Sequence, residues 1–243
     1  MSSLRARQLV VLRDRMRRLE KPRAAELPVL SLGLTVLDNV LPWGGLPTGA
    51  LHEILGRPGD AAACGFAVRL LRDLVRLRQR PVLWCRGDEE SGAPYAPGLM
   101  QNGLACDSVI FARARKPAEL LWAMEEGLRS GAFAAVYGED AAPDLTATRR
   151  LQLAAEAGAT MALLSLPYRV AGGVSAALTR WHVTSVPVEA EEAARWQIEL
   201  ARCRGGEGGA WQVTCSPGGN DEALRLRLAA VLADRSLASD AAE

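Results

Sequence analysis

A glycine-containing turn between an apolar strand and an amphipathic helix is the part of the sequence with the clearest chemical precedent. Residues 50–55 are predicted to form a strand and residues 56–60 a turn. The helix that follows carries an apolar stripe at three-and-four spacing, formed by Phe66, Leu70, Leu71, Leu74 and Val75. A strand, a glycine turn and a helix in this order are the arrangement of a P-loop, in which backbone N–H groups hold phosphates.

The side chains that a P-loop uses for nucleotide chemistry are missing from this turn. The motif GxxxxGK[ST] supplies a lysine for the outer phosphates and a hydroxyl for Mg²⁺. Loss of both contacts removes about 3–6 kcal/mol of binding free energy. We therefore expect no bound cofactor and no metal, although an ordinary βα turn without P-loop ancestry is an alternative reading. The positions of this degenerate motif are Gly56, Arg57, Pro58, Gly59, Asp60, Ala61, Ala62 and Ala63.

The remaining candidate catalytic groups are few and scattered. Residues 132–137 are predicted to form a strand that ends in Tyr137, where a P-loop ATPase has a Mg²⁺-ordering aspartate. Glu139 and Asp140 follow one or two residues late and are assigned to capping or to a solvated loop. His52 and His182 lie on predicted strands without metal-ligand spacing, which favours packing or hydrogen bonding. No nucleophile–base–acid set is visible, so the sequence predicts that the protein is not an enzyme.

Length and composition set the class of protein. A chain of 243 residues suits one α/β domain with terminal additions. Its 29 basic and 28 acidic residues nearly cancel, so net charge does not indicate a nucleic-acid-binding protein. Five cysteines without CxxC spacing indicate reduced thiols in the cytoplasm. No apolar run reaches the 18 residues of a membrane span, and we expect a cytoplasmic protein.

Alternating strand and helix patterns predict an α/β fold with a mainly parallel sheet flanked by helices. Near the C-terminus the pattern changes to alternating strands at residues 177–186, 195–204 and 210–216, which predicts an antiparallel extension. We divide the chain into an N-terminal amphipathic helix and linker (1–27), a core (28–216), and a C-terminal helix and tail (217–243).

Two predicted amphipathic helices, at residues 4–20 and 221–235, flank the core and are candidate partner-binding elements. Their apolar stripes contain Leu12 and Met16 in the first helix and Leu224, Leu228 and Leu232 in the second. We expect at least one of them to dock on a partner protein or on a second copy of the chain. Weak contact with DNA is a further hypothesis, and it rests on Arg113, Arg115, Lys116 and Arg169.

Three stretches carry a family resemblance: LPVLSLGLTVLDNVLPWGGLPTGALHEILG, TATRRLQLAAEAGATMALLSLPY and RWQIELARCRGGEGGAWQV. Through them the chain resembles the RecA superfamily over residues 28–216, and within it the ImuA family. The resemblance implies a RecA-like core and a role in the SOS response to DNA damage, in error-prone translesion synthesis and mutagenesis. It also implies binding to ImuB, an inactive Y-family polymerase homologue, beside an error-prone polymerase, and association with the nucleoid after damage.

Three functions therefore remain open from the sequence. The first is a non-hydrolysing adaptor in a DNA-repair complex, and the second is an ATPase with a deviant loop that uses Arg57 or Arg69 as its cation. The third is a DNA-binding recombinase regulator, and a SulA-like cell-division inhibitor is a further reading of the same resemblance. The missing lysine and hydroxyl argue against the second function, and the balanced charge argues against the third.

Overall fold

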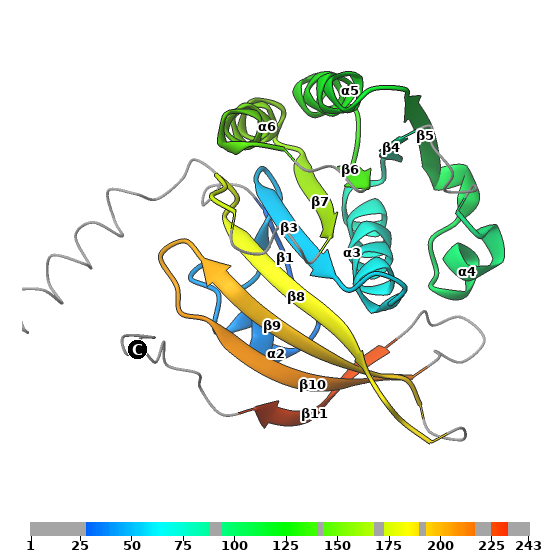
Figure 1. Ribbon diagram of the computed structural model, residues 1–243, viewed down its shortest axis with the longest axis vertical. Coiled ribbons are helices and arrows are strands. Elements are labelled where there is room, and N and C mark those ends of the chain that lie inside the picture. The colour runs from blue at the N-terminus through cyan, green and yellow to red at the C-terminus, as the bar shows by residue number, and fades with distance from the viewer. Residues whose placement is uncertain are drawn as a thin grey trace, which may run out of the picture.

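The computed structural model describes residues 28–87, 94–139, 143–167, 173–189, 193–216 and 225–232, which form a mixed α/β fold around a nine-stranded sheet (Figure 1). The strand order is β11-β10-β9-β8-β3-β7-β6-β4-β5. Strands β5, β4, β6, β7, β3 and β8 run parallel, and β9, β10 and β11 continue the sheet in antiparallel pairs. This confirms the predicted α/β class, the mainly parallel sheet and the antiparallel extension.

The parallel part is built from strands that alternate with helices along the chain. Its strands are β3 (Leu51–Gly56), β4 (Val82–Gly87), β5 (Val109–Ala114), β6 (Ala135–Glu139), β7 (Met161–Pro167) and β8 (Thr179–Val186). Its helices are α3 (Ala62–Arg78), α4 (Ala96–Gln101), α5 (Pro117–Ser130) and α6 (Leu145–Gly158), with a 3-10 turn, η2 (Cys106–Ser108), before β5. A separate two-stranded sheet of β1 (Val29–Leu30) and β2 (Leu46–Pro47) precedes β3, and α2 (Thr35–Asp38) lies between them.

Helices cover both faces of the sheet, α3 on one and α5 with α6 on the other (Figure 1). Side chains alternate along β3: Leu51 and Leu55 join the core beneath α5 and α6, whereas Ile54 joins the core around α3. Adjacent residues of β3 therefore meet different environments.

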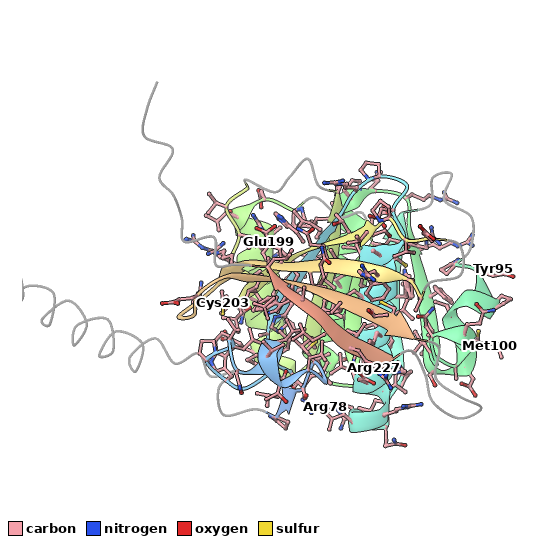
Figure 2. The ribbon with its side chains drawn as sticks, turned by 90° about the horizontal axis from the view of Figure 1, so that it is seen from below. Arg78, Tyr95, Met100, Glu199, Cys203 and Arg227 are labelled. Atoms are coloured by element: carbon pink, nitrogen blue, oxygen red, sulfur yellow. The ribbon has the colours of Figure 1, made fainter. Side chains whose placement is uncertain are left out.

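The antiparallel strands β9 (Arg195–Cys203), β10 (Gly209–Ser216) and β11 (Arg225–Leu232) complete the core around α3. Phe66 and Leu70 of α3 share one buried cluster with Trp196, Trp211 and Leu226 from these strands. In the β9–β10 hairpin Trp211 lies opposite Ile198 and Val213 lies opposite Trp196. Figure 2, seen from below, shows these strands in front of α3.

The predicted C-terminal helix is wrong within the described residues, because Arg225–Leu232 forms strand β11. β11 pairs with β10 along its whole described length, and a bulge shifts the register between Gln212 and Val213. Leu226 is buried, whereas Leu228 is 41% exposed. Leu228 and Leu232 therefore do not form a helical stripe, and Leu224 lies outside the described residues. The predicted helix over residues 4–20, with Leu12 and Met16, also lies outside them.

The helices of the described ranges are each too short or too polar to cross a lipid bilayer. Tyr95, directly before α4, and Met100 of α4 are exposed, on the opposite side of the molecule from Cys203 (Figure 2).

Candidate functional site

The turn between β3 and α3 is closed by its own aspartate. The Asp60 carboxylate accepts a hydrogen bond from the Ala62 N–H (2.9 Å), at the first turn of α3. It also accepts bonds from the Ser185 hydroxyl (2.6 Å) and the Ser185 N–H (2.8 Å), at the end of β8. A helix N-terminus favours an anion, and here the chain supplies that anion itself.

These bonds set the protonation of Asp60. Burial alone would raise the pKa of the carboxyl, but the bonds from Ser185 and Ala62 and the charge of Arg57 outweigh that effect. The pKa therefore lies below its ordinary value, and the carboxylate is charged at neutral pH.

The two positions that hold lysine and serine or threonine in a P-loop are buried in this turn. Ala62 is 2% exposed and Ala63 is 4% exposed, and both belong to the core around α3. A Cβ added at Gly56 would lie 2.5 Å from the Ala63 Cβ, so the helix start packs directly on the end of β3. One added at Gly65 would lie 2.9 Å from the Trp196 ring, because β9 packs against this turn of the helix.

The acidic residue at the end of β6 is also engaged. Glu139 accepts a hydrogen bond from the Trp84 indole N–H (3.0 Å) and lies 3.5 Å from the Arg86 guanidinium. Tyr137, which is 1% exposed, packs edge-on against Trp84 with ring centroids 4.6 Å apart. This end of the sheet is therefore an aromatic cluster with one paired carboxylate.

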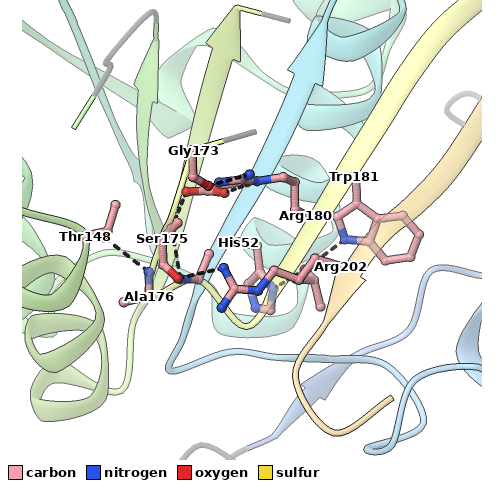
Figure 3. A network of polar contacts seen from close by, with 11 residues as sticks. His52, Thr148, Gly173, Ser175, Ala176, Arg180, Trp181 and Arg202 are labelled. Carbon is pink, nitrogen blue, oxygen red and sulfur yellow. Dashed lines mark hydrogen bonds and ion pairs between the residues drawn. The ribbon is translucent and has the colours of Figure 1, made fainter. Parts of the chain in front are cut away.

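Glu53 and Arg180 form a buried ion pair on the face of β3 that carries Leu51 and Leu55. Figure 3 shows Arg180 and the residues around it. Glu53 is 1% exposed and accepts hydrogen bonds from Arg180 Nε (2.6 Å) on β8 and from the Ser175 hydroxyl (2.5 Å). Arg180 also donates to the Gly173 carbonyl (2.8 Å). The pair thus ties residues 173–175 to β3 and β8.

His52 is the neighbour of Glu53 on β3 and points to the other face. Its Nε2 lies 3.0 Å from the Pro47 carbonyl, which accepts the ring proton, and its Nδ1 lies 2.8 Å from the Thr179 hydroxyl. The Thr179 oxygen accepts from the Trp181 indole N–H (2.9 Å), which leaves its own proton for His52 Nδ1. Full burial lowers the His52 pKa to about 4, so the ring is a neutral packing residue, as the sequence indicated.

A groove lies beside α6, and we call it the α6 groove. It is bounded by Arg149 and Leu153 of α6, by Val174, and by Arg202 and Arg204 at the end of β9. Its volume is about 450 Å³. A second cavity of about 360 Å³, floored by Glu53 and Arg180, shares Leu145, Val174 and Ser175 with it.

Comparison with known proteins gives the family. Protein ImuA of Caulobacter vibrioides, found in two strains, is 35% identical to this chain over 232 residues. The alignment covers 87% of this chain and 93% of the relative. The chain belongs to the ImuA family. No family model matches the sequence.

In this ImuA-family chain the positive residues predicted to contact DNA are only partly brought together. Arg113, Arg115 and Lys116 are exposed at the carboxyl end of β5, which is an edge strand of the sheet. Arg169 lies outside the described residues. The α6 groove contains none of these residues and uses other arginines.

Arg69, which the sequence offered as the cation of a deviant ATPase, is buried in the middle of α3. It is 6% exposed, lies 4.0 Å from Asp73, and extends toward Gly33. Burial lowers its pKa. These contacts place the Arg69 guanidinium against the segment after β1 and not at the turn.

Sequence reasoning missed the Asp60–Ser185 contact, the Glu53–Arg180 pair and the α6 groove. The partners in the first two are 125 and 127 residues apart. The one local signal is Glu53 itself, a carboxylate in an otherwise apolar strand, which requires a buried cation or donors.

Proposed function

We propose that this protein is a non-hydrolysing, RecA-like adaptor in damage-induced, error-prone translesion DNA synthesis. Membership of the ImuA family supports a role in the ImuA/ImuB mutagenesis system. Its partner in that role would be an ImuB-like inactive Y-family polymerase homologue. Under this proposal the turn after β3 is a P-loop that has lost its nucleotide chemistry.

One observation carries the non-hydrolysing part of the proposal: the Asp60 carboxylate already bonds the first turn of α3. A nucleotide phosphate at this place would meet a fixed negative charge instead of a lysine. Restoring the lysine and hydroxyl at Ala62 and Ala63 would force both side chains out of the core. The turn as built opposes phosphate binding on both grounds.

The alternative of an ATPase with a deviant loop needs a cation that reaches the phosphates. Arg69 is held near Gly33 and Asp73, which leaves Arg57, an exposed residue beside Asp60, as the remaining candidate in the turn. Its charge is partly offset by that carboxylate. The adaptor is therefore the better-supported function.

The test combines nucleotide binding with partner binding on the full chain. Calorimetric titration with Mg²⁺–ATP should show no binding stronger than about 1 mM, and phosphate release should stay at the buffer rate. Size-exclusion chromatography with a purified ImuB-like homologue should give a co-eluting complex, with or without ATP.

The double variant Ala62→Lys/Ala63→Thr is the matched control for the turn, and we expect no ATP turnover from it. Phosphate release above the buffer rate by the native chain would refute the non-hydrolysing assignment, and a micromolar dissociation constant for ATP would refute the loss of nucleotide binding. Failure to co-elute with the ImuB homologue would refute the adaptor role instead, so the two parts fail separately.

A further inference from the structure

We propose that the α6 groove binds an extended acidic peptide that carries an apolar anchor residue. This site is distinct from the β3–α3 turn and does not depend on which protein fills the adaptor role. Its argument rests on the charge, the fixed geometry and the exposed apolar side chains of the groove.

The groove has more positive than negative charge. Three guanidinium groups, those of Arg149, Arg202 and Arg204, line it together with a single carboxylate, Glu156. That carboxylate already accepts a hydrogen bond from Gln152 (2.8 Å). Neither Arg149 nor Arg204 forms an ion pair with any residue in the described ranges. An acidic ligand would therefore neutralise charge that the described residues leave without an ion-pair partner.

Repulsion inside the groove supports the same conclusion. Burial and then the neighbouring charges of Arg180 and Arg204 lower the pKa of Arg202, against the opposing effect of Glu53. A carboxylate placed beside Arg202 and Arg204 would offset the repulsion between these two residues of the groove.

The floor of the groove is fixed before any ligand arrives. Arg202 Nη1 donates to the Ser175 carbonyl (2.7 Å), and the Ser175 hydroxyl is held by the buried Glu53 (Figure 3). The next residue, Ala176, donates its N–H to the Thr148 hydroxyl on α6 (3.2 Å). Residues 175–176 thus connect α6 to β3 and β9, and a ligand would not have to order them.

Two aliphatic side chains stand exposed on the rim of this cationic groove. Leu153 is 63% exposed and Val174 is 71% exposed. Beside the aliphatic stems of Arg149 and Arg204 they offer a surface for one apolar side chain of a ligand. A ligand with carboxylates alone would leave this surface in water.

These features favour a peptide over a nucleic acid. The described residues that line the groove include no aromatic ring on which a base could stack. The volume of about 450 Å³ lies in the range of ligand sites. The 14 residues of α6 span about 21 Å, which matches about six residues of extended peptide.

The probe is a fluorescein-labelled hexapeptide, Asp-Asp-Leu-Asp-Asp-Phe, titrated with the full chain by fluorescence anisotropy at low salt. We expect saturable binding that weakens as salt is added. The variant Arg149→Glu/Arg204→Glu should weaken it at least about tenfold, and Leu153→Asp should weaken it several-fold. The matched control Arg76→Glu/Arg80→Glu makes the same change in charge at the C-terminal end of α3 and two residues beyond it, and should bind as the native chain does.

Circular dichroism and the urea midpoint of each variant establish that it is folded. A peptide of six aspartates should bind more weakly than the probe, because it lacks the anchor. Absence of probe binding, or binding that survives Arg149→Glu/Arg204→Glu, would overturn the proposal. It would also be overturned if a twelve-nucleotide oligothymidine bound the groove and the peptide failed to displace it.

Discussion

The turn between β3 and α3 and the α6 groove differ in how far the fold itself provides partners for their charged side chains. At the turn the Asp60 carboxylate is bonded by α3 and by β8, and the positions around it are buried. At the groove, arginines stand beside one carboxylate and partly face water. A site where the fold satisfies its own polar groups serves stability, whereas one that leaves them open is suited to a partner.

The largest effect should come from the buried pair beneath the groove. Glu53→Ala leaves Arg180 charged and buried, and we expect it to lower the free energy of unfolding by about 3–5 kcal/mol. Urea denaturation followed by circular dichroism measures this loss.

The double variant Glu53→Leu/Arg180→Leu is its control, because it removes both charges and leaves apolar side chains. It should be clearly more stable than Glu53→Ala. If the double variant were less stable than Glu53→Ala, the two residues would act independently.

His52 should make the stability of the fold depend on pH. Its pKa is about 4 in the folded state and about 6.5 when unfolded, so the unfolded chain binds the proton more readily between these values. The neutral His52 ring contributes up to about 3 kcal/mol to the free energy of unfolding. This contribution is complete above pH 6.5 and is lost as the pH falls toward 4.

The measurement is the free energy of unfolding of the native chain and of His52→Gln at several pH values. The gap between them should narrow as the pH falls from 7 to 4, because glutamine does not titrate. A gap that stays constant with pH would contradict the assigned neutral ring.

Asp60→Ala removes the anion from the turn and should cost about 2 kcal/mol, since three hydrogen bonds to one charged group are lost. The exposed Asp107→Ala serves as control and should change stability by less than about 0.5 kcal/mol. Equal urea midpoints for the two variants would mean that the turn is not held by Asp60.

The smallest effect on stability should come from the groove. Arg149→Glu/Arg204→Glu should change the free energy of unfolding by no more than about 0.5 kcal/mol, because neither arginine has an ion-pair partner in the described parts of the chain. A loss of several kcal/mol would assign these arginines to the fold and not to a partner.

Periodicity sufficed to predict the parallel sheet, because alternating strands and helices leave a strong local pattern. It failed at β11, whose sequence RLRLAAVL is rich in leucine, alanine and arginine, all strong helix formers. Pairing with β10 overrides that preference, and in the extended form Leu226 is buried in the core. The period-two alternation of Arg225, Leu226, Arg227 and Leu228 was the signal for a strand.

The turn between β3 and α3 could be located from sequence, but its closure by Asp60 and Ser185 could not. Asp60 is one of 28 acidic residues, and nothing local distinguishes it from a solvated one. Its partner Ser185 becomes adjacent only because β8 pairs with β3. The α6 groove likewise combines a helix, a connecting segment and the end of β9, so three distant stretches must fold before it exists.

The enclosure of α3 by the late strands has a consequence for biosynthesis. One face of α3 packs on β3 and β8. The core around α3 also contains Trp196, Trp211 and Leu226, which follow Phe66 in the sequence by at least 130 residues. During translation the apolar sides of this helix stay without their final cover until the last quarter of the chain has left the ribosome. Truncation before β11 would leave this core open, and such nascent chains should depend on chaperones that recognise exposed apolar helices.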